Sequence, residues 1–160
     1  MMNMRRKDRE VTNSGKIKEI IEKSEVIRIG YYDDGEVYIV PVNYGYEEVD
    51  GKYTFFFHGA NAGRKYELSK NGCKVGFELE SRAEILVNDE VSCRSTCYYN
   101  SVIGKGKISL IADSQEKEKA LNLIMKHYSG KDIHTFEEKW VNVVAVFKLD
   151  VQKLSCKERA

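Results

Sequence analysis

The sequence has little that points to a membrane, a nucleic acid or a metal. No apolar run is long enough to cross a bilayer, and 26 basic against 25 acidic residues leave a net charge of only +1. Three scattered histidines and a Cys93-x3-Cys97 spacing do not match a zinc or redox motif, so no metal site is predicted. With no apolar leader after the start, we expect a cytoplasmic protein with reduced thiols. Its cysteines are Cys73, Cys93, Cys97 and Cys156.

Proline is almost absent as well, and the single one falls inside a strand-like segment. Pro41 interrupts the apolar run from Val37 to Tyr44. Because proline cannot donate a ladder hydrogen bond, this strand must lie at an edge or carry an irregularity. Its main-chain groups could then bond a flat ligand, or the edge could have no role in binding.

The remaining pattern predicts one domain over residues 1–160, with residues 1–13 as a solvated or dimer-wrapping arm. We expect a short helix ending near Ser24 and capped by Thr12 or Ser14, and a second helix over 62–69. A long helix should begin after Asp113 and end at Gly130. Strands are expected at 26–32, 37–46, 53–57, 74–80, 85–87, 97–110 and 141–149.

The turns between these strands favour hairpins. Asp33-Asp34-Gly35 and Asp50-Gly51 are typical of tight hairpin turns, and strands do not alternate regularly with helices. The fold class is therefore mainly β (α+β), an antiparallel barrel with attached helices. We also expect Trp140 to open a buried strand, His127 to interact with a helix dipole, and most tyrosines to lie on strand surfaces.

One segment has the character of a phosphate site. An apolar strand, Phe55 to Phe57, runs through His58 into small residues and then Arg64-Lys65. Glycines allow close backbone approach, a helix start would present N–H groups, and the two cations supply a fork and a point charge. A solvated Arg-Lys pair at a helix start is the alternative. Neither a Walker loop nor a dinucleotide glycine motif occurs.

Four segments, taken in their order along the chain, carry a family resemblance, and the second of them lies within the phosphate-like segment. They are Val40-Pro41-Val42-Asn43-Tyr44-Gly45-Tyr46, Phe56-Phe57-His58-Gly59-Ala60 with Gly63-Arg64-Lys65, Cys73-Lys74-Val75-Gly76-Phe77-Glu78, and Tyr99-Asn100-Ser101-Val102-Ile103-Gly104-Lys105-Gly106. The set resembles the pyridoxamine 5′-phosphate oxidase-like split-barrel flavoproteins. It is most similar to their 5-nitroimidazole resistance subgroup, whose members also begin with a stretch like Met4 to Glu10. The similarity extends over almost the whole chain.

This resemblance implies a split β-barrel homodimer with FMN at the subunit interface. It places Arg64 and Lys65 at the phosphate, and Phe57 and His58 beside the cofactor. It also places Tyr99 and Ser101 on another side. The strand that lines the isoalloxazine is formed by Val40, Pro41, Val42 and Asn43. Gly63 replaces the serine that oxidases have before this Arg-Lys pair, and the oxidase's carboxy-terminal substrate residues have no evident counterpart.

The function expected from these features is an FMN-dependent reduction of a small planar acceptor, with nitroimidazoles as the compound class that the resemblance suggests. His58 could donate a proton or position the acceptor, and a purely structural histidine is the equal alternative. From another class, the chain could be a carrier or sensor that binds flavin or another small ligand without turnover. A pyridoxamine phosphate oxidase is a third reading, and haem or a deazaflavin are alternative cofactors.

Overall fold

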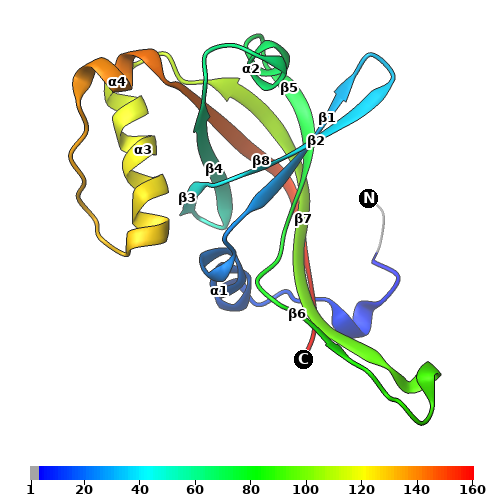
Figure 1. Cartoon of the computed structure of the whole chain (residues 1–160). Coiled ribbons are helices and arrows are strands. Elements are labelled where there is room, and N and C mark those ends of the chain that lie inside the picture. The colour runs from blue at the N-terminus through cyan, green and yellow to red at the C-terminus, as the bar shows by residue number, and fades with distance from the viewer. Residues whose placement is uncertain (1–3) are drawn as a thin grey trace.

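A computed structural model describes residues 4–160, so the first three residues of the expected arm lie outside the described part. Eight antiparallel strands form one sheet that curls without closing, with helices packed beside it (Figure 1). The predicted split-barrel class is therefore confirmed. The strands are β1 (Ile27–Asp33), β2 (Glu36–Val42), β3 (Gly45–Val49), β4 (Lys52–Gly59), β5 (Cys73–Leu79), β6 (Ala83–Leu86), β7 (Thr96–Leu110) and β8 (Ala145–Arg159). The helices are η1 (Lys7–Arg9), α1 (Ser14–Lys23), α2 (Arg64–Ser69), η2 (Ser92–Arg94), α3 (Ser114–Ser129) and α4 (Glu138–Val143).

The split in the barrel lies between the two ends of the sheet. The strand order is β2-β1-β5-β7-β8-β4-β3, with β6 added beside β7, so β2 and β3 are both edges. Pro41 pairs in unbroken register with Arg28 of β1, and among residues 4–160 no further strand lies on the other side of β2. Of the two expectations for this proline, the edge is the one that the fold adopts.

Two hydrophobic clusters hold the sheet and helices together. Inside the barrel, the rings of Phe57 and Phe147 stack 4.7 Å apart, with Phe55 also fully buried. On the other face of β4 and β8, Phe56 and Val146 pack against α3 and α4. Strand alternation sends neighbouring phenylalanines to opposite faces, so one strand contributes to both clusters.

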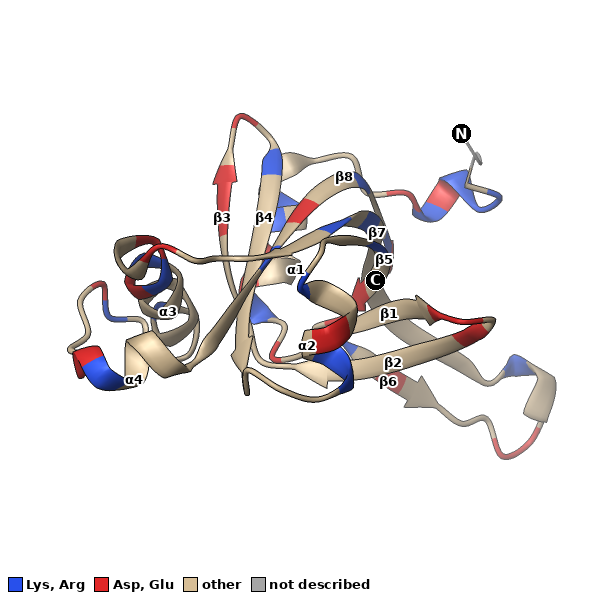
Figure 2. Ribbon diagram, turned by 90° about the horizontal axis from the view of Figure 1, so that it is seen from above, with Lys and Arg blue, Asp and Glu red and all other residues tan. Residues whose placement is uncertain are grey.

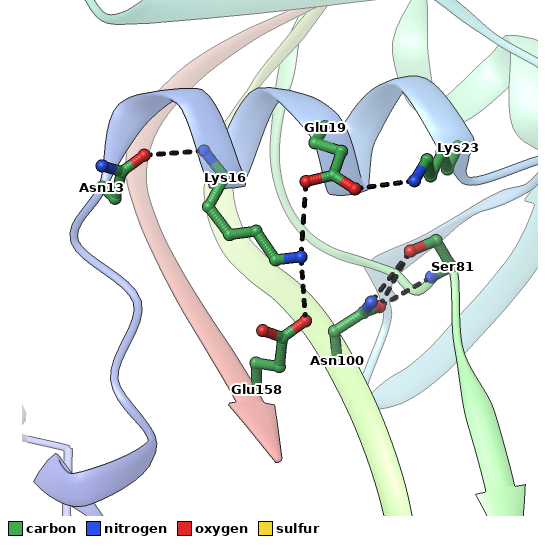
Figure 3. Close-up of polar contacts among 7 residues, drawn as sticks. All are labelled: Asn13, Lys16, Glu19, Lys23, Ser81, Asn100 and Glu158. Carbon is green, nitrogen blue, oxygen red and sulfur yellow. Dashed lines mark hydrogen bonds and ion pairs between the residues drawn. The ribbon is translucent and has the colours of Figure 1, made fainter. Parts of the chain in front are cut away.

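Polar contacts attach α1 to β8, and the segment between β5 and β6 to β7 (Figure 3). Asn13 caps α1 by accepting from the Lys16 N–H at 2.9 Å, so the expected caps Thr12 and Ser14 were wrong. The Lys16 ammonium lies 3.5 Å from Glu158, which links α1 to β8. The buried Asn100 of β7 accepts from the backbone N–H of Ser81 at 2.8 Å.

Two of the expected strands differ in the structure. The segment 37–46 is two strands, because Tyr44 turns inward and its hydroxyl donates to the carbonyl oxygens of Ile21 and Ser24 at 2.5 and 3.0 Å. The segment 141–149 begins within α4, and the strand starts only at Ala145. Trp140 lies on α4 and is 61% exposed, so it does not open a buried strand. A short apolar run fits helix and strand equally, and packing of Val141 against α3 decides here.

Candidate functional site

A pocket of about 290 Å³ lies at the split of the barrel. Pairing between β3 and β4 extends only to Phe56, so His58 and Gly59 lie beyond the end of β3. The edge strand β2 forms the other wall. The pocket is lined by Val26, Pro41, Val42, Asn43, His58 and Lys65. All of these residues except Val26 belong to the predicted cofactor site. The structure brings them together although Pro41 and Lys65 are 24 positions apart in the sequence.

Lys65 presents a positive charge that no carboxylate neutralises. Its ammonium lies 5.7 Å from the ring centre of Phe57 and 5.2 Å from that of Phe147. Within residues 4–160 it makes neither a salt bridge nor a hydrogen bond, and burial lowers its pKa. An anion brought beside it would restore the electrostatic stabilisation that partial loss of water has removed. The ammonium is therefore suited to a phosphate or carboxylate.

Gly59 provides the space that this ammonium occupies. A Cβ built on Gly59 would fall 2.8 Å from Nζ of Lys65 and 3.1 Å from its Cε. Any larger residue would displace the lysine from its position over the two rings. The absence of a side chain at Gly59 thus lets Lys65 occupy its position in the pocket.

His58 is exposed near the end of β4, where it pairs in register with Val146. Partial burial, and then the charge of Lys65, hold the pKa of its imidazole below the usual range. The neutral ring is favoured at neutral pH, with one nitrogen able to donate and the other to accept. A nearby negative charge on a ligand would favour the imidazolium instead.

Arg64 points to a different part of the protein from its neighbour. Its Nε donates to Asp33 at 2.8 Å, its Nη2 lies 3.6 Å from Glu36, and its guanidinium covers the Tyr38 ring at 4.5 Å. Acidic residues gather at the tip of the β1–β2 hairpin (Figure 2), and Arg64 attaches α2 to that hairpin. It does not line the pocket in the single chain.

The other predicted residues surround the pocket at greater distance or lie elsewhere. Phe57 is buried beneath Lys65, and Val40 packs against the barrel core. Tyr99 lies near the start of β7, where its hydroxyl accepts from Arg9 at 3.1 Å. Ser101 is also on β7, paired in register with Lys157 of β8. Neither lines the pocket of one chain.

Two contributors were missed by sequence reasoning. Val26 lines the pocket from the segment between α1 and β1. Tyr128, in the last turn of α3, donates its hydroxyl hydrogen to the Glu25 carbonyl at 2.6 Å, beside Val26. No local pattern marks either residue. His127 was expected to be a dipole partner, yet its ring packs 4.4 Å from the buried Tyr44 ring, and burial lowers its pKa.

A second pocket of about 350 Å³ begins on the other side of Val26. Its cations are already paired with carboxylates: Arg28 with Glu80 at 3.1 Å, Lys23 with Glu19 at 2.6 Å and Arg82 with Glu84 at 2.7 Å. Burial raises the pKa of Glu78, beside Arg28, to about 7. The unpaired charge of Lys65 therefore distinguishes the first pocket as the better anion site.

Two further findings bound the kind of site. Across residues 4–160, no cluster of three or more histidine, cysteine or acidic side chains is arranged to hold a metal ion. In the same part of the chain, no helix has the length and apolar character needed to span a membrane.

The open antiparallel barrel with a pocket at its split defines the class as a split-barrel protein. A family model of pyridoxamine 5′-phosphate oxidase matches residues 13–158, and the chain therefore belongs to that family. No curated protein matches the chain in sequence.

Several solved structures are similar. A candidate 5-nitroimidazole antibiotic resistance protein from Bacteroides thetaiotaomicron VPI-5482 has a TM-score of 0.78 and 27% identity, covering 93% of this chain and 86% of that one. A flavocytochrome from Azotobacter vinelandii has a TM-score of 0.77 and 19% identity, covering 99% and 72%. An FAD- and haem-binding protein from Mycobacterium smegmatis has a TM-score of 0.77 and 15% identity, covering 94% and 73%. The last two share the fold.

Proposed function

We propose that this protein binds FMN and uses it to reduce a small planar acceptor, with nitroimidazoles as the first compounds to test. The observation that carries the proposal is the unpaired, partly buried ammonium of Lys65 in a pocket at the barrel split. Family membership and the similarity to the Bacteroides protein support a flavin and a nitroimidazole respectively.

The residues of the pocket fit such a cofactor. Lys65 would hold the phosphate, because its charge has no other partner within residues 4–160. The edge of β2 would hold the flat ring, because within residues 4–160 β2 pairs only with β1 and the main-chain groups on its other side meet no strand. When bound, the flavin supplies the electron transfer. The chain orients the acceptor and, through an N–H of His58, delivers a proton to it.

A second copy of the chain completes this site in our proposal. The pocket of about 290 Å³ is at the lower limit of the roughly 300 Å³ that enclosed ligand sites begin with, so one chain provides part of a flavin site. The β1–β2 and β6–β7 hairpins project from the barrel (Figure 1). They expose Tyr32, Val37, Ile39, Ile85 and Val87. We propose that these apolar side chains pack in a homodimer, where Tyr99 and Ser101 reach the partner's flavin.

The test compares FMN with riboflavin, which lacks the phosphate. Lys65→Met keeps most of the side chain and removes the charge, and it should weaken FMN binding by about 1.5–3 kcal/mol, the usual worth of a charged hydrogen bond. Riboflavin affinity should stay unchanged. Lys23→Met is the matched control, since Lys23 is paired with Glu19 in the neighbouring pocket. Equal loss for both ligands, or none, would remove Lys65 from the phosphate site.

Arg64→Ala in the same titration decides the role of the arginine. If Arg64 turns to the phosphate when FMN binds, its removal weakens FMN and leaves riboflavin unchanged. If it only attaches the hairpin through Asp33, both affinities fall together. The absorption spectrum of the purified wild type comes first: flavin bands support the proposal, whereas a Soret band alone or a protein that takes up no flavin would contradict it.

A further inference from the structure

Tyr128 makes three hydrogen bonds with a single hydroxyl group, one of them to Asn43 of the pocket lining. The oxygen lies 2.6 Å from the Glu25 carbonyl oxygen, 3.0 Å from the Tyr44 backbone nitrogen and 3.2 Å from Nδ2 of Asn43. A carbonyl can only accept, so the hydroxyl donates to Glu25 and its two lone pairs accept from the other two groups. The hydroxyl is thereby fully used, and it joins Asn43 and Tyr44, 85 and 84 residues away along the chain, to Glu25, 103 residues away.

These contacts fix the orientation of the Asn43 amide. Its nitrogen also donates to the Glu25 carbonyl at 3.3 Å, so the amide nitrogen is held toward Glu25 and Tyr128. The amide oxygen has no hydrogen-bond partner among the described residues, and Asn43 lines the pocket. This oxygen remains free to accept, so a ligand group that faces it must be a donor.

The preceding residue on α3 strengthens this arrangement. Nε2 of His127 lies 2.7 Å from the Ser24 carbonyl, and its ring packs on Tyr44. The last turn of α3 thus holds both the 24–26 segment and the 43–44 segment. Val26 and Asn43, two walls of the pocket, are positioned by the same helix end.

We propose that Tyr128 is a positioning residue that holds Asn43 as a hydrogen-bond acceptor for an N–H group of the bound ring. This inference rests on the proposed function and names the contact within it: the imide N–H of the flavin's pyrimidine ring is the donor. Asn43 makes the contact with the ligand, and Tyr128 acts through Asn43. Specificity for a ring with an N–H at that position follows, because an unpaired acceptor would be left facing any other group.

The experiment measures discrimination between FMN and FMN methylated at the imide nitrogen, which cannot donate. In the wild type, FMN should bind about tenfold more tightly than the methylated form, which is the usual scale for one hydrogen bond. Tyr128→Phe, which keeps the ring and loses the hydroxyl, should bring the ratio close to one. Tyr46→Phe is the control, since it also removes one hydroxyl contact, to Glu22 at 2.8 Å, but does not touch the pocket. It should keep the wild-type ratio.

Asn43→Ala provides a second variant, in which Tyr128 still donates to the Glu25 carbonyl and accepts from the Tyr44 backbone N–H. It should also lose the discrimination, with thermal stability recorded for all variants. A ratio that stays at the wild-type value in both Tyr128→Phe and Asn43→Ala would overturn the inference while the proposed function stands. A wild-type protein that binds FMN but does not discriminate would also overturn it. No flavin uptake by the wild type would contradict the proposed function first, and this inference with it.

Discussion

At the scale of single residues, His58 is the group in the pocket with acid–base chemistry. Its pKa is lowered by partial burial and by Lys65, so its protonated fraction grows only as the pH falls below about 6.5, the ordinary value for a histidine. A proton donated by the imidazolium makes the reaction faster in mild acid. The rate should therefore fall as the pH rises through the pKa that His58 has in the flavin-bound protein.

We predict that His58→Ala keeps the flavin spectrum but slows the oxidation of pre-reduced protein by a nitroimidazole by roughly 10²-fold, the scale of general acid catalysis. The rise in rate toward low pH should disappear in the same variant. Anaerobic stopped-flow mixing measures both without a physiological electron donor. An unchanged rate per bound flavin would give His58 a packing role alone and favour a carrier or sensor.

Lys65 and Arg64 show how adjacent residues diverge. Successive residues on a helix point about 100° apart, so one cation faces the pocket and the other faces the β1–β2 hairpin. The sequence shows two adjacent cations and predicts that they act together. The structure places only Lys65 in the pocket of one chain.

At the scale of elements, the close approach of β3 to α3 sets the position of the helix that carries Tyr128. A Cβ on Gly45 would fall 2.4 Å from the backbone nitrogen of Ile124 and from the carbonyl carbon of Leu123. Rigid helix backbone cannot give way as a flexible side chain can. Only glycine allows this contact, which also buries Phe56 against α3.

Gly45→Ala should therefore lower the free energy of unfolding by about 1–3 kcal/mol or more, as overpacking does, and should weaken flavin binding by displacing α3. Gly76→Ala on β5 is the matched control in another part of the sheet, since its nearest contact would be an ordinary 3.8 Å. It should change stability by no more than about 0.5 kcal/mol. Urea unfolding followed by circular dichroism measures both. A Gly45→Ala protein as stable as the control would show that α3 can shift freely.

At the scale of the whole molecule, assembly completes the site in our proposal. Val37, on the β1–β2 hairpin, is 72% exposed, and Ile133, on the segment between α3 and α4, is 87% exposed. Both are apolar and accessible in one chain, but only Val37 belongs to the hairpins that we place in the interface. A stable dimer would bury at least about 1,200 Å² in total.

Val37→Lys should therefore shift the protein from dimer to monomer and reduce flavin uptake, because a charge would be buried in an apolar contact. Ile133→Lys should leave both properties as in the wild type. Light scattering coupled to size exclusion reports the mass, and absorbance reports the bound flavin. A wild-type monomer that carries flavin at micromolar concentration would refute the dimeric site.

The sequence by itself determined the hairpin turns, most of the strands and the fold class. The turns predicted at Asp33 to Gly35 and at Asp50-Gly51 are present, with positive φ at Asp34, Gly35, Asp50 and Gly51. Backbone sterics at these positions depend on a few neighbouring residues, so they can be read locally. The ordered segments around Pro41 and His58 identified the family for a similar reason, since each is a contiguous string.

Only the tertiary structure decided how the pocket is assembled. Packing between distant elements decides the exposure of Trp140 and the inward turn of Tyr44. It also decides that Lys65 faces the pocket while Arg64 faces the β1–β2 hairpin. The contact between Asn43 and Tyr128 joins residues 85 positions apart, and nothing near either residue in the chain signals it. Local preferences select the strands and turns, whereas the site depends on which of them meet at the split of the barrel.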